Sequence, residues 1–193
     1  MNFLAHLHIA NHCDSDLQGN LLGDFVKGDP SKQYEERLVK GIKLHRFVDS
    51  YTDTHAVMKE TKSLFPKGVR RFSPIAMDMF WDHCLAANWE RYHDESLRSF
   101  CDFAEAQARQ HSEFPLPSRY LNLMSIMWDQ RWLESYQHLD NIEYALIRMS
   151  SRSPRMSELK NCFEHIENNY HQLLERFELL YPDVLAAAKA QSF

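Results

Sequence analysis

Glycine is scarce in this chain, and its distribution limits the fold more than any other feature. The chain has 193 residues with 5 glycines, and none of them follows Gly68. Proteins contain roughly 7% glycine on average, and all-β folds need turn residues about every 8–12 residues. The long stretch after Gly68 cannot supply those turns, so we expect an all-α, single-domain helical bundle.

The same scarcity excludes several classes of catalytic or nucleotide-binding protein. The Rossmann fingerprint G-x-G-x-x-G and the phosphate loop G-x-x-x-x-G-K-[ST] need glycine where the backbone approaches a pyrophosphate. Neither pattern occurs, and G-x-S-x-G and H-E-x-x-H are also absent. Any catalytic site must therefore be assembled from residues distant in the sequence.

Composition places the chain among globular proteins. Hydrophobic residues make up 44% and charged residues 25%, with a mean hydropathy of -0.52, which is typical of neither disordered nor membrane chains. No linker, repeat or low-complexity segment divides it, so we expect one domain over residues 1–193. No apolar run approaches the 18 or so residues of a membrane span. The N-terminus lacks a signal-peptide pattern, so we expect a cytoplasmic protein.

The net charge and the cysteine content argue against some binding partners and some kinds of site. The formal net charge is -5, which argues against nucleic-acid binding. The 4 cysteines, Cys13, Cys84, Cys101 and Cys162, form no C-x-x-C, so we interpret them as reduced thiols and not as a zinc or redox site. The sequence carries no indication of oligomeric state.

Helical periodicity runs between the prolines. Expected helices cover 3–10, 35–53, 73–90, 94–111, a segment beginning at 118, 140–149 and 159–181, with 19–30 as a loop or short helix. We expect Ser73, Asp94 and Ser118 to be N-caps, Pro74 to occupy the first helical position, and Pro182 to end the last helix.

Histidines and aspartates are concentrated in the N-terminal half. On the 35–53 helix, His45 and Asp49 share a face with Leu38 and Ile42, so both should point inward. On the 73–90 helix, Asp78 and Asp82 lie a turn apart among apolar residues. Buried carboxylates are costly unless a cation or hydrogen-bond donors meet them, and imidazole with carboxylate suits Mn, Fe, Zn or Mg.

Structural explanations compete with this metal site. The acids could pair with arginines, and His45 could be a satisfied core residue. His6 and Asp24, each set in apolar sequence, could be caps or core hydrogen-bonding groups instead of ligands. We expect His8 and most other histidines to be surface residues.

Five ordered segments resemble one known family, the acyl carrier protein phosphodiesterases. These segments are NFLAHLHIA, GNLLGDFVKG, GIKLHRFVDSYTD, PIAMDMFWDHCLA and MSSRSPRM. The resemblance runs from Met1 into the last helix. It implies an all-helical, atypical relative of the HD phosphohydrolases. It also implies a hydrolase that cleaves the phosphodiester joining 4′-phosphopantetheine to a serine of holo acyl carrier protein.

The resemblance also implies a divalent cation, manganese first, with Mg²⁺, Fe²⁺ or Co²⁺ as the other candidates. The only His-Asp pair is His93-Asp94, outside the resembling segments, and the pair inside them is reversed as Asp82-His83. The ligands are therefore assigned from the resembling segments. The metal candidates are His6, Asp24, His45, Asp82 and Asp78, and the candidates for water activation or leaving-group protonation are Asp24, Asp49 and His83.

Acyl carrier proteins are acidic, so a net-negative enzyme needs a local cationic face to bind one. Two basic clusters flank prolines, and each could instead be a solvated surface. The candidate partner-binding residues are Lys67, Arg70 and Arg71 near Pro66, and Arg152 and Arg155, with Arg148 and Lys160, near Pro154.

Two other functions remain open. A phosphohydrolase of a small phosphate ester or nucleotide would use the same ligands without the basic clusters. A non-catalytic helical adaptor for an acidic partner would use the basic clusters without the ligands.

Overall fold

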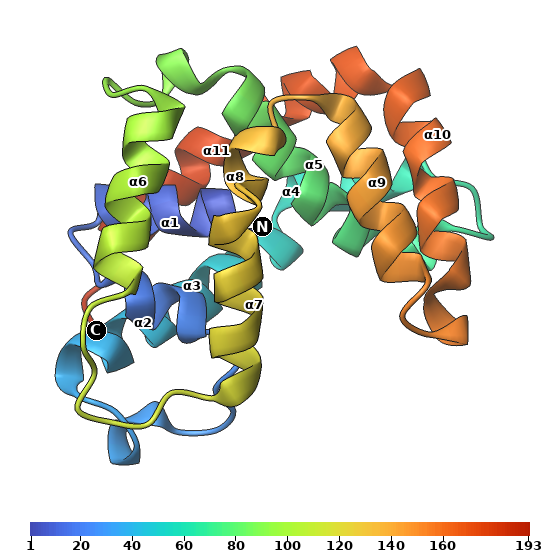
Figure 1. Cartoon of the computed structure of the whole chain (residues 1–193). Coiled ribbons are helices and arrows are strands. Elements are labelled where there is room, and N and C mark those ends of the chain that lie inside the picture. The colour runs from blue at the N-terminus through green and yellow to red at the C-terminus, as the bar shows by residue number, and fades with distance from the viewer.

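A computed structural model describes residues 1–193 and contains only helices and their connections (Figure 1). The expectation of an all-α fold is confirmed. The α-helices are α1 (Phe3–His12), α2 (Leu17–Leu22), α3 (Glu36–Thr54), α4 (Ala56–Ser63), α5 (Ser73–Ala87), α6 (Leu97–Ala108), α7 (Ser118–Asp129), α8 (Trp132–Ser135), α9 (Leu139–Ser150), α10 (Cys162–Asn168) and α11 (Tyr170–Lys189). Short 3₁₀ helices are η1 (Pro30–Lys32), η2 (Arg70–Phe72), η3 (Trp89–Arg91) and η4 (Pro154–Asn161).

Helices α1 and α5 form the centre of the molecule. Every residue of α1 from Leu4 to Ala10 is buried, as are nearly all residues of α5 from Ala76 to Ala86. Helices that are apolar on all sides are covered on all sides, and α1 packs against α2, α3, α5 and α11. Figure 1 shows α6 and α7 on one side of α5, and α9 and α10 on the other. None of the helices is long and apolar enough to cross a membrane.

The burial of α1 overturns one expectation about the histidines. His8 is only 3% exposed and is not a surface residue. Its Nδ1 lies 2.7 Å from the Tyr181 hydroxyl and its Nε2 3.1 Å from the Tyr92 carbonyl oxygen. Both ring nitrogens have partners, so His8 is a satisfied core residue linking α1 to α11 and the η3 segment.

The glycines before Gly68 serve helix packing as well as turns. An added Cβ at Gly19 in α2 would lie 2.5 Å from the Leu38 carbonyl oxygen, and one at Gly41 in α3 would lie 2.6 Å from the Asn20 nitrogen. Real Cβ atoms do not approach backbone atoms this closely, so only glycine permits the backbones of α2 and α3 to touch. This contact fixes the position of the residues that follow α2.

Several expected helix boundaries are wrong. The Ser96 side chain, not Asp94, caps α6, while Ser73 and Ser118 are the first residues of their helices and make no cap. Pro74 does occupy the first turn of α5, as expected.

The largest boundary error concerns the last helix. The chain breaks near Asn169 between α10 and α11, and α11 continues through Pro182 to Lys189. Pro182 is exposed, so the carbonyl that loses its helical donor lies on the solvent side, where water can satisfy it.

All cysteines are free, as expected, and none is fully exposed. Burial raises the pKa of Cys13, Cys84 and Cys101, and raises that of Cys162 to about 11. The thiols therefore stay protonated at neutral pH.

The contact between α2 and α3 predicts an unusual cost for a small substitution. Gly41→Ala should lower the free energy of unfolding by about 1–3 kcal/mol, because the new methyl group meets backbone atoms that cannot move aside. Urea denaturation of the variant and wild type measures this difference. Gly68→Ala is the matched control, since an added Cβ there meets nothing within 4 Å. Equal stability of the two variants would contradict the close contact.

Candidate functional site

Two buried histidines from different helices form the centre of the candidate site. The rings of His6 in α1 and His45 in α3 stack with centroids 3.8 Å apart and planes 13° from parallel. Each residue is about 2% exposed or less. The inward direction expected for His45 is confirmed, because its side chain is buried against His6 of α1.

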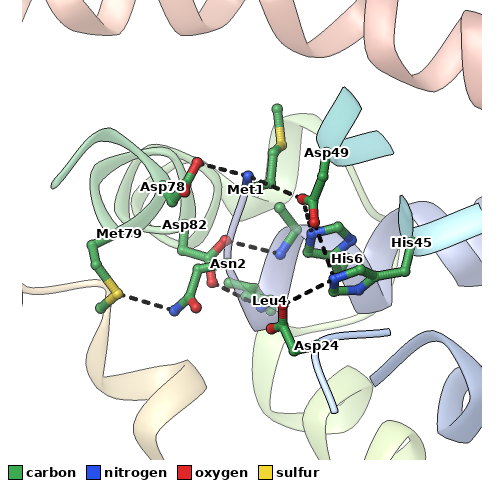
Figure 2. Close-up of polar contacts among 11 residues, drawn as sticks. Met1, Asn2, Leu4, His6, Asp24, His45, Asp49, Asp78, Met79 and Asp82 are labelled. Carbon is green, nitrogen blue, oxygen red and sulfur yellow. Dashed lines mark hydrogen bonds and ion pairs between the residues drawn. The ribbon is translucent and has the colours of Figure 1, made fainter. Parts of the chain in front are cut away.

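Two carboxylates approach this imidazole pair (Figure 2). His6 Nε2 donates a hydrogen bond to Asp49 Oδ1 at 2.9 Å, and His45 Nε2 lies 3.2 Å from Asp49 Oδ2 and 3.4 Å from Asp24 Oδ1. Figure 2 shows Asp49 and Asp24 on opposite sides of the rings. Their side chains are 40% and 54% exposed, so the imidazoles form a buried floor and the acids face solvent.

Gly23 holds the ring of His45 in place. An added Cβ at Gly23 would lie 2.2 Å from His45 Cγ, so the backbone at the end of α2 rests directly on the imidazole. Asp24 follows immediately in the chain. The approach of α2 to α3 therefore sets both the orientation of His45 and the position of Asp24.

The charges of the four groups are strongly coupled. Burial lowers the pKa of His6 to about 4, with the charge of His45 acting in the same direction. Burial would also lower the pKa of His45, but Asp24 and Asp49 outweigh it and raise that pKa to about 9. Although burial favours the protonated acids, the histidines hold the pKa values of Asp49 and Asp24 below their usual range. The site thus holds two carboxylates and a single imidazolium at neutral pH.

This donor set fits a divalent cation. Ligand atoms of His6, His45 and Asp49 all lie within 4.8 Å of one another. His45 Nε2 is buried and makes no hydrogen bond of acceptable geometry, and ligation through it requires loss of its proton. Nitrogen and oxygen donors with exposed carboxylates suit borderline or hard divalent ions.

A cavity of about 240 Å³ opens onto the acids. It is lined by Met1, Asn2, Asp24, Asp49, Asp53, Ile75, Asp78, Met79 and Met149. The amino group of Met1 donates to Asp78 Oδ1 at 2.7 Å and lies 3.8 Å from Asp49 Oδ1. Burial raises the pKa of Asp78 against the opposing effect of this amino group. Asp78 therefore faces the same cavity as Asp49, but its carboxylate is already paired with the amino group of Met1.

The other two sequence candidates lie in different surroundings. Asp82 Oδ2 and Oδ1 accept hydrogen bonds from the backbone nitrogens of Leu4 and Ala5, at 2.8 and 3.0 Å. Burial raises the pKa of Asp82 to about 7, against these two bonds. His83 Nδ1 lies 2.8 Å from the Tyr136 carbonyl oxygen and Nε2 3.0 Å from the Tyr170 hydroxyl. Both side chains are hydrogen-bonded to groups elsewhere in the fold. The structure therefore groups His6, Asp24, His45 and Asp49 without them.

The two basic clusters lie on neighbouring elements, since η2 packs against η4. Their side chains are exposed, and none of them is among the cations that form ion pairs. Arg70 Nε donates to the Phe65 carbonyl oxygen, and the Arg71 guanidinium lies 4.5 Å from the centre of the Phe72 ring. The surface therefore carries a concentration of uncompensated positive charge.

Sequence comparisons identify the relatives of this chain. The family model described as acyl carrier protein phosphodiesterase matches residues 1–184. A protein of that name from Pectobacterium atrosepticum is 42% identical over 192 residues, covering 99% of each chain. Proteins of the same name from Yersinia enterocolitica and Serratia proteamaculans are each 42% identical over 191 residues, covering 98% of each chain.

The chain therefore belongs to the acyl carrier protein phosphodiesterase family. No solved structure matches it, so the relation to HD phosphohydrolases stays a prediction.

The contact between Gly23 and His45 gives a test of the site that leaves every candidate ligand in place. Gly23→Ala should displace the imidazole and weaken binding of Co²⁺, a coloured divalent probe, by about tenfold or more, since supporting contacts of metal ligands typically matter by 10–100-fold. Visible absorbance during a Co²⁺ titration measures the affinity. Gly68→Ala should bind Co²⁺ like the wild type, and an unchanged affinity for Gly23→Ala would refute the assignment of His45 as a ligand.

Proposed function

We propose that this chain hydrolyses the phosphodiester between 4′-phosphopantetheine and the serine of holo acyl carrier protein, releasing the apo carrier. One observation carries the proposal. In a chain aligned nearly end to end with proteins named acyl carrier protein phosphodiesterase, buried imidazoles and half-exposed carboxylates meet at the edge of a cavity. A phosphodiester is a poor electrophile, and this donor set suits metal-assisted hydrolysis.

The proposed ligands are His6, His45, Asp49 and Asp24, with Mn²⁺ as the first candidate ion. When bound, such an ion lowers the pKa of water and neutralises charge on the phosphoryl oxygens. Asp78, another candidate ligand, lines the same cavity and would add negative charge beside Asp49. Asp82 caps the N-terminal end of α1 and is assigned a structural role, since its oxygens already accept backbone hydrogen bonds.

The acids have distinct roles in this proposal. Before an ion binds, Asp49 accepts the Nε2 proton of His6 and so orients that ring. Ligation through this nitrogen would require loss of its proton, as for His45. Asp24 is the most exposed of the four side chains and faces the cavity, where it can accept a proton from an attacking water at an oxygen not needed by His45. His83, whose two nitrogens are both engaged away from the cavity, is assigned no proton transfer.

The basic clusters are the proposed docking surface for the carrier. Lys67, Arg70, Arg71, Arg152 and Arg155 lie exposed on η2, η4 and the segments that precede them. Unpaired cations attract an acidic protein and raise the rate of encounter, even though the whole chain is net negative.

The first experiment measures the carrier itself. Holo acyl carrier protein incubated with the enzyme and Mn²⁺ should lose its phosphopantetheine mass in intact-mass spectrometry, and a chelator should prevent the loss. Asp24→Asn should reduce the rate at least about 100-fold, because it removes a carboxylate from the reacting centre. Asp183→Asn is the matched control, since Asp183 is exposed and contacts only His55 among the ionisable groups.

Three outcomes would reject the proposal or its site. Full activity of Asp24→Asn, with unchanged circular dichroism, removes that residue from the site. An unchanged carrier together with hydrolysis of bis(p-nitrophenyl) phosphate indicates the small-ester phosphohydrolase. Absence of both reactions and of Mn²⁺ binding indicates the non-catalytic adaptor.

Carrier docking makes a separate prediction. The double variant Lys67→Glu/Arg71→Glu should raise KM for holo carrier several-fold and weaken its salt dependence, with little change in kcat, because steering acts before the chemical step. Arg70 is left intact because its guanidinium holds the Phe65 carbonyl. Arg98→Glu, on the exposed face of α6, is the control. A KM equal to that of the control would exclude this cluster from the docking surface.

A further inference from the structure

A second, larger cavity adjoins the candidate site. It has a volume of about 510 Å³ and shares Asn2, Asp24, Met79 and Met149 with the cavity beside the acids. Binding sites for small molecules commonly enclose about 300–1,000 Å³. Asp24 lines both cavities, so a molecule bound in the larger cavity lies directly beside one of the proposed catalytic carboxylates.

The walls of this cavity combine apolar surface with hydrogen-bonding groups. Aromatic side chains come from the start of α1, the segment after α2, α8 and the residue after it, and α9, and amide side chains lie among them. The residues relevant here are Phe3, Phe25, Trp132, Tyr136, Tyr144 and Asn141. Such a lining suits a ligand that alternates hydrocarbon with amide groups.

Three arginines line this cavity, and Arg148 is the one whose guanidinium lies near two aromatic rings of the lining. Its guanidinium lies 5.6 Å from the ring centre of Tyr144, one turn earlier in α9, and 5.8 Å from the Trp132 ring. No acidic side chain pairs with it. An arginine held between aromatic rings and left without a counter-ion is a preorganised donor for phosphate.

We propose that this cavity binds the 4′-phosphopantetheine arm of the substrate, an inference that rests on the proposed function. Arg148 donates to the phosphate, and Asp24, a proposed ligand, lines the same cavity. The aromatic wall of Trp132 and Tyr144 packs against the hydrocarbon of the arm, and Asn141 pairs with an amide. The acidic carrier remains outside, on the other residues of the basic clusters, of which Arg152 also lines the cavity.

The size and charge of the cavity favour the phosphopantetheine arm as its occupant. Residues of several helices line the cavity, and its volume of about 510 Å³ lies in the range of small-molecule sites, which suits the arm better than a folded helix of the carrier. It contains cations and no acid besides Asp24, which matches a ligand with one anionic end and a neutral body.

The first test uses the free product as a probe. Calorimetric titration should show that 4′-phosphopantetheine binds the wild type more tightly than either pantetheine or inorganic phosphate does, because only the whole molecule contacts both the guanidinium and the aromatic wall. Arg148→Ala should weaken binding by about tenfold or more, as expected for a lost charged hydrogen bond. Arg98→Ala should leave it unchanged, and equal affinities in the two variants would overturn the assignment.

The second test fills the cavity. Ala145→Trp places a large ring inside it and should abolish binding of 4′-phosphopantetheine and cleavage of holo carrier. Ala186→Trp adds the same ring on the exposed face of α11 and should affect neither. Co²⁺ affinity, measured on both variants, reports an intact metal site. Cleavage by Ala145→Trp at the wild-type rate would place the arm elsewhere.

The two proposals fail in different ways. If the wild type binds 4′-phosphopantetheine through Arg148 but never cleaves the carrier, the cavity assignment stands and the proposed function falls. If the wild type cleaves the carrier while Arg148→Ala and Ala145→Trp change neither binding nor rate, the function stands and the cavity assignment falls. If Arg148→Ala raises only KM for the carrier, the arginine belongs to the docking surface.

Discussion

The close contact between α2 and α3 is the constraint on which the rest of the site depends. Gly19 and Gly41 let the two backbones touch, and Gly23 continues that contact onto the ring of His45. Any side chain at these positions would separate the helices and move Asp24 away from the imidazole. Three of the five glycines are thus placed where close contact sets the geometry of polar side chains, a requirement no other residue type can meet.

The stacked imidazoles show how the fold tolerates buried ionisable groups. The two rings stack 3.8 Å apart. Burial, with the charge of His45, lowers the pKa of His6 to about 4, whereas the carboxylates of Asp24 and Asp49 outweigh burial and raise the pKa of His45 to about 9. The pair therefore titrates as a unit, with the two acids as its counter-ions. A divalent cation would replace the single proton with two charges at the same place. The two carboxylates therefore favour binding of a cation at this place.

Part of this site could be read from the sequence because its geometry is local. His45 and Asp49 are one helical turn apart, and apolar neighbours at the same spacing predict the buried face. The stripe of Asp78 and Asp82 was equally visible, but its partners were not. The backbone of α1 that meets Asp82, and the amino group that meets Asp78, lie 77 or 78 residues away in the chain. No periodicity encodes such a contact, so the sequence around a buried acid is the same whether the acid binds a metal or a helix N-terminus.

His6 and His8 show the same limit, since α1 is covered on every side and both are buried. The aromatic wall around Arg148 had one local signal, the spacing of Tyr144 and Arg148 by four residues.

The state of the cysteines has a consequence for an enzyme whose proposed substrate ends in a thiol. Disulfide exchange begins with attack by a thiolate, and its rate follows the thiolate fraction and access of the attacking sulfur. Burial raises the pKa of every cysteine in this chain. The protein therefore offers almost no nucleophilic sulfur of its own. It can handle pantetheine repeatedly without becoming trapped as a mixed disulfide with the molecule it releases.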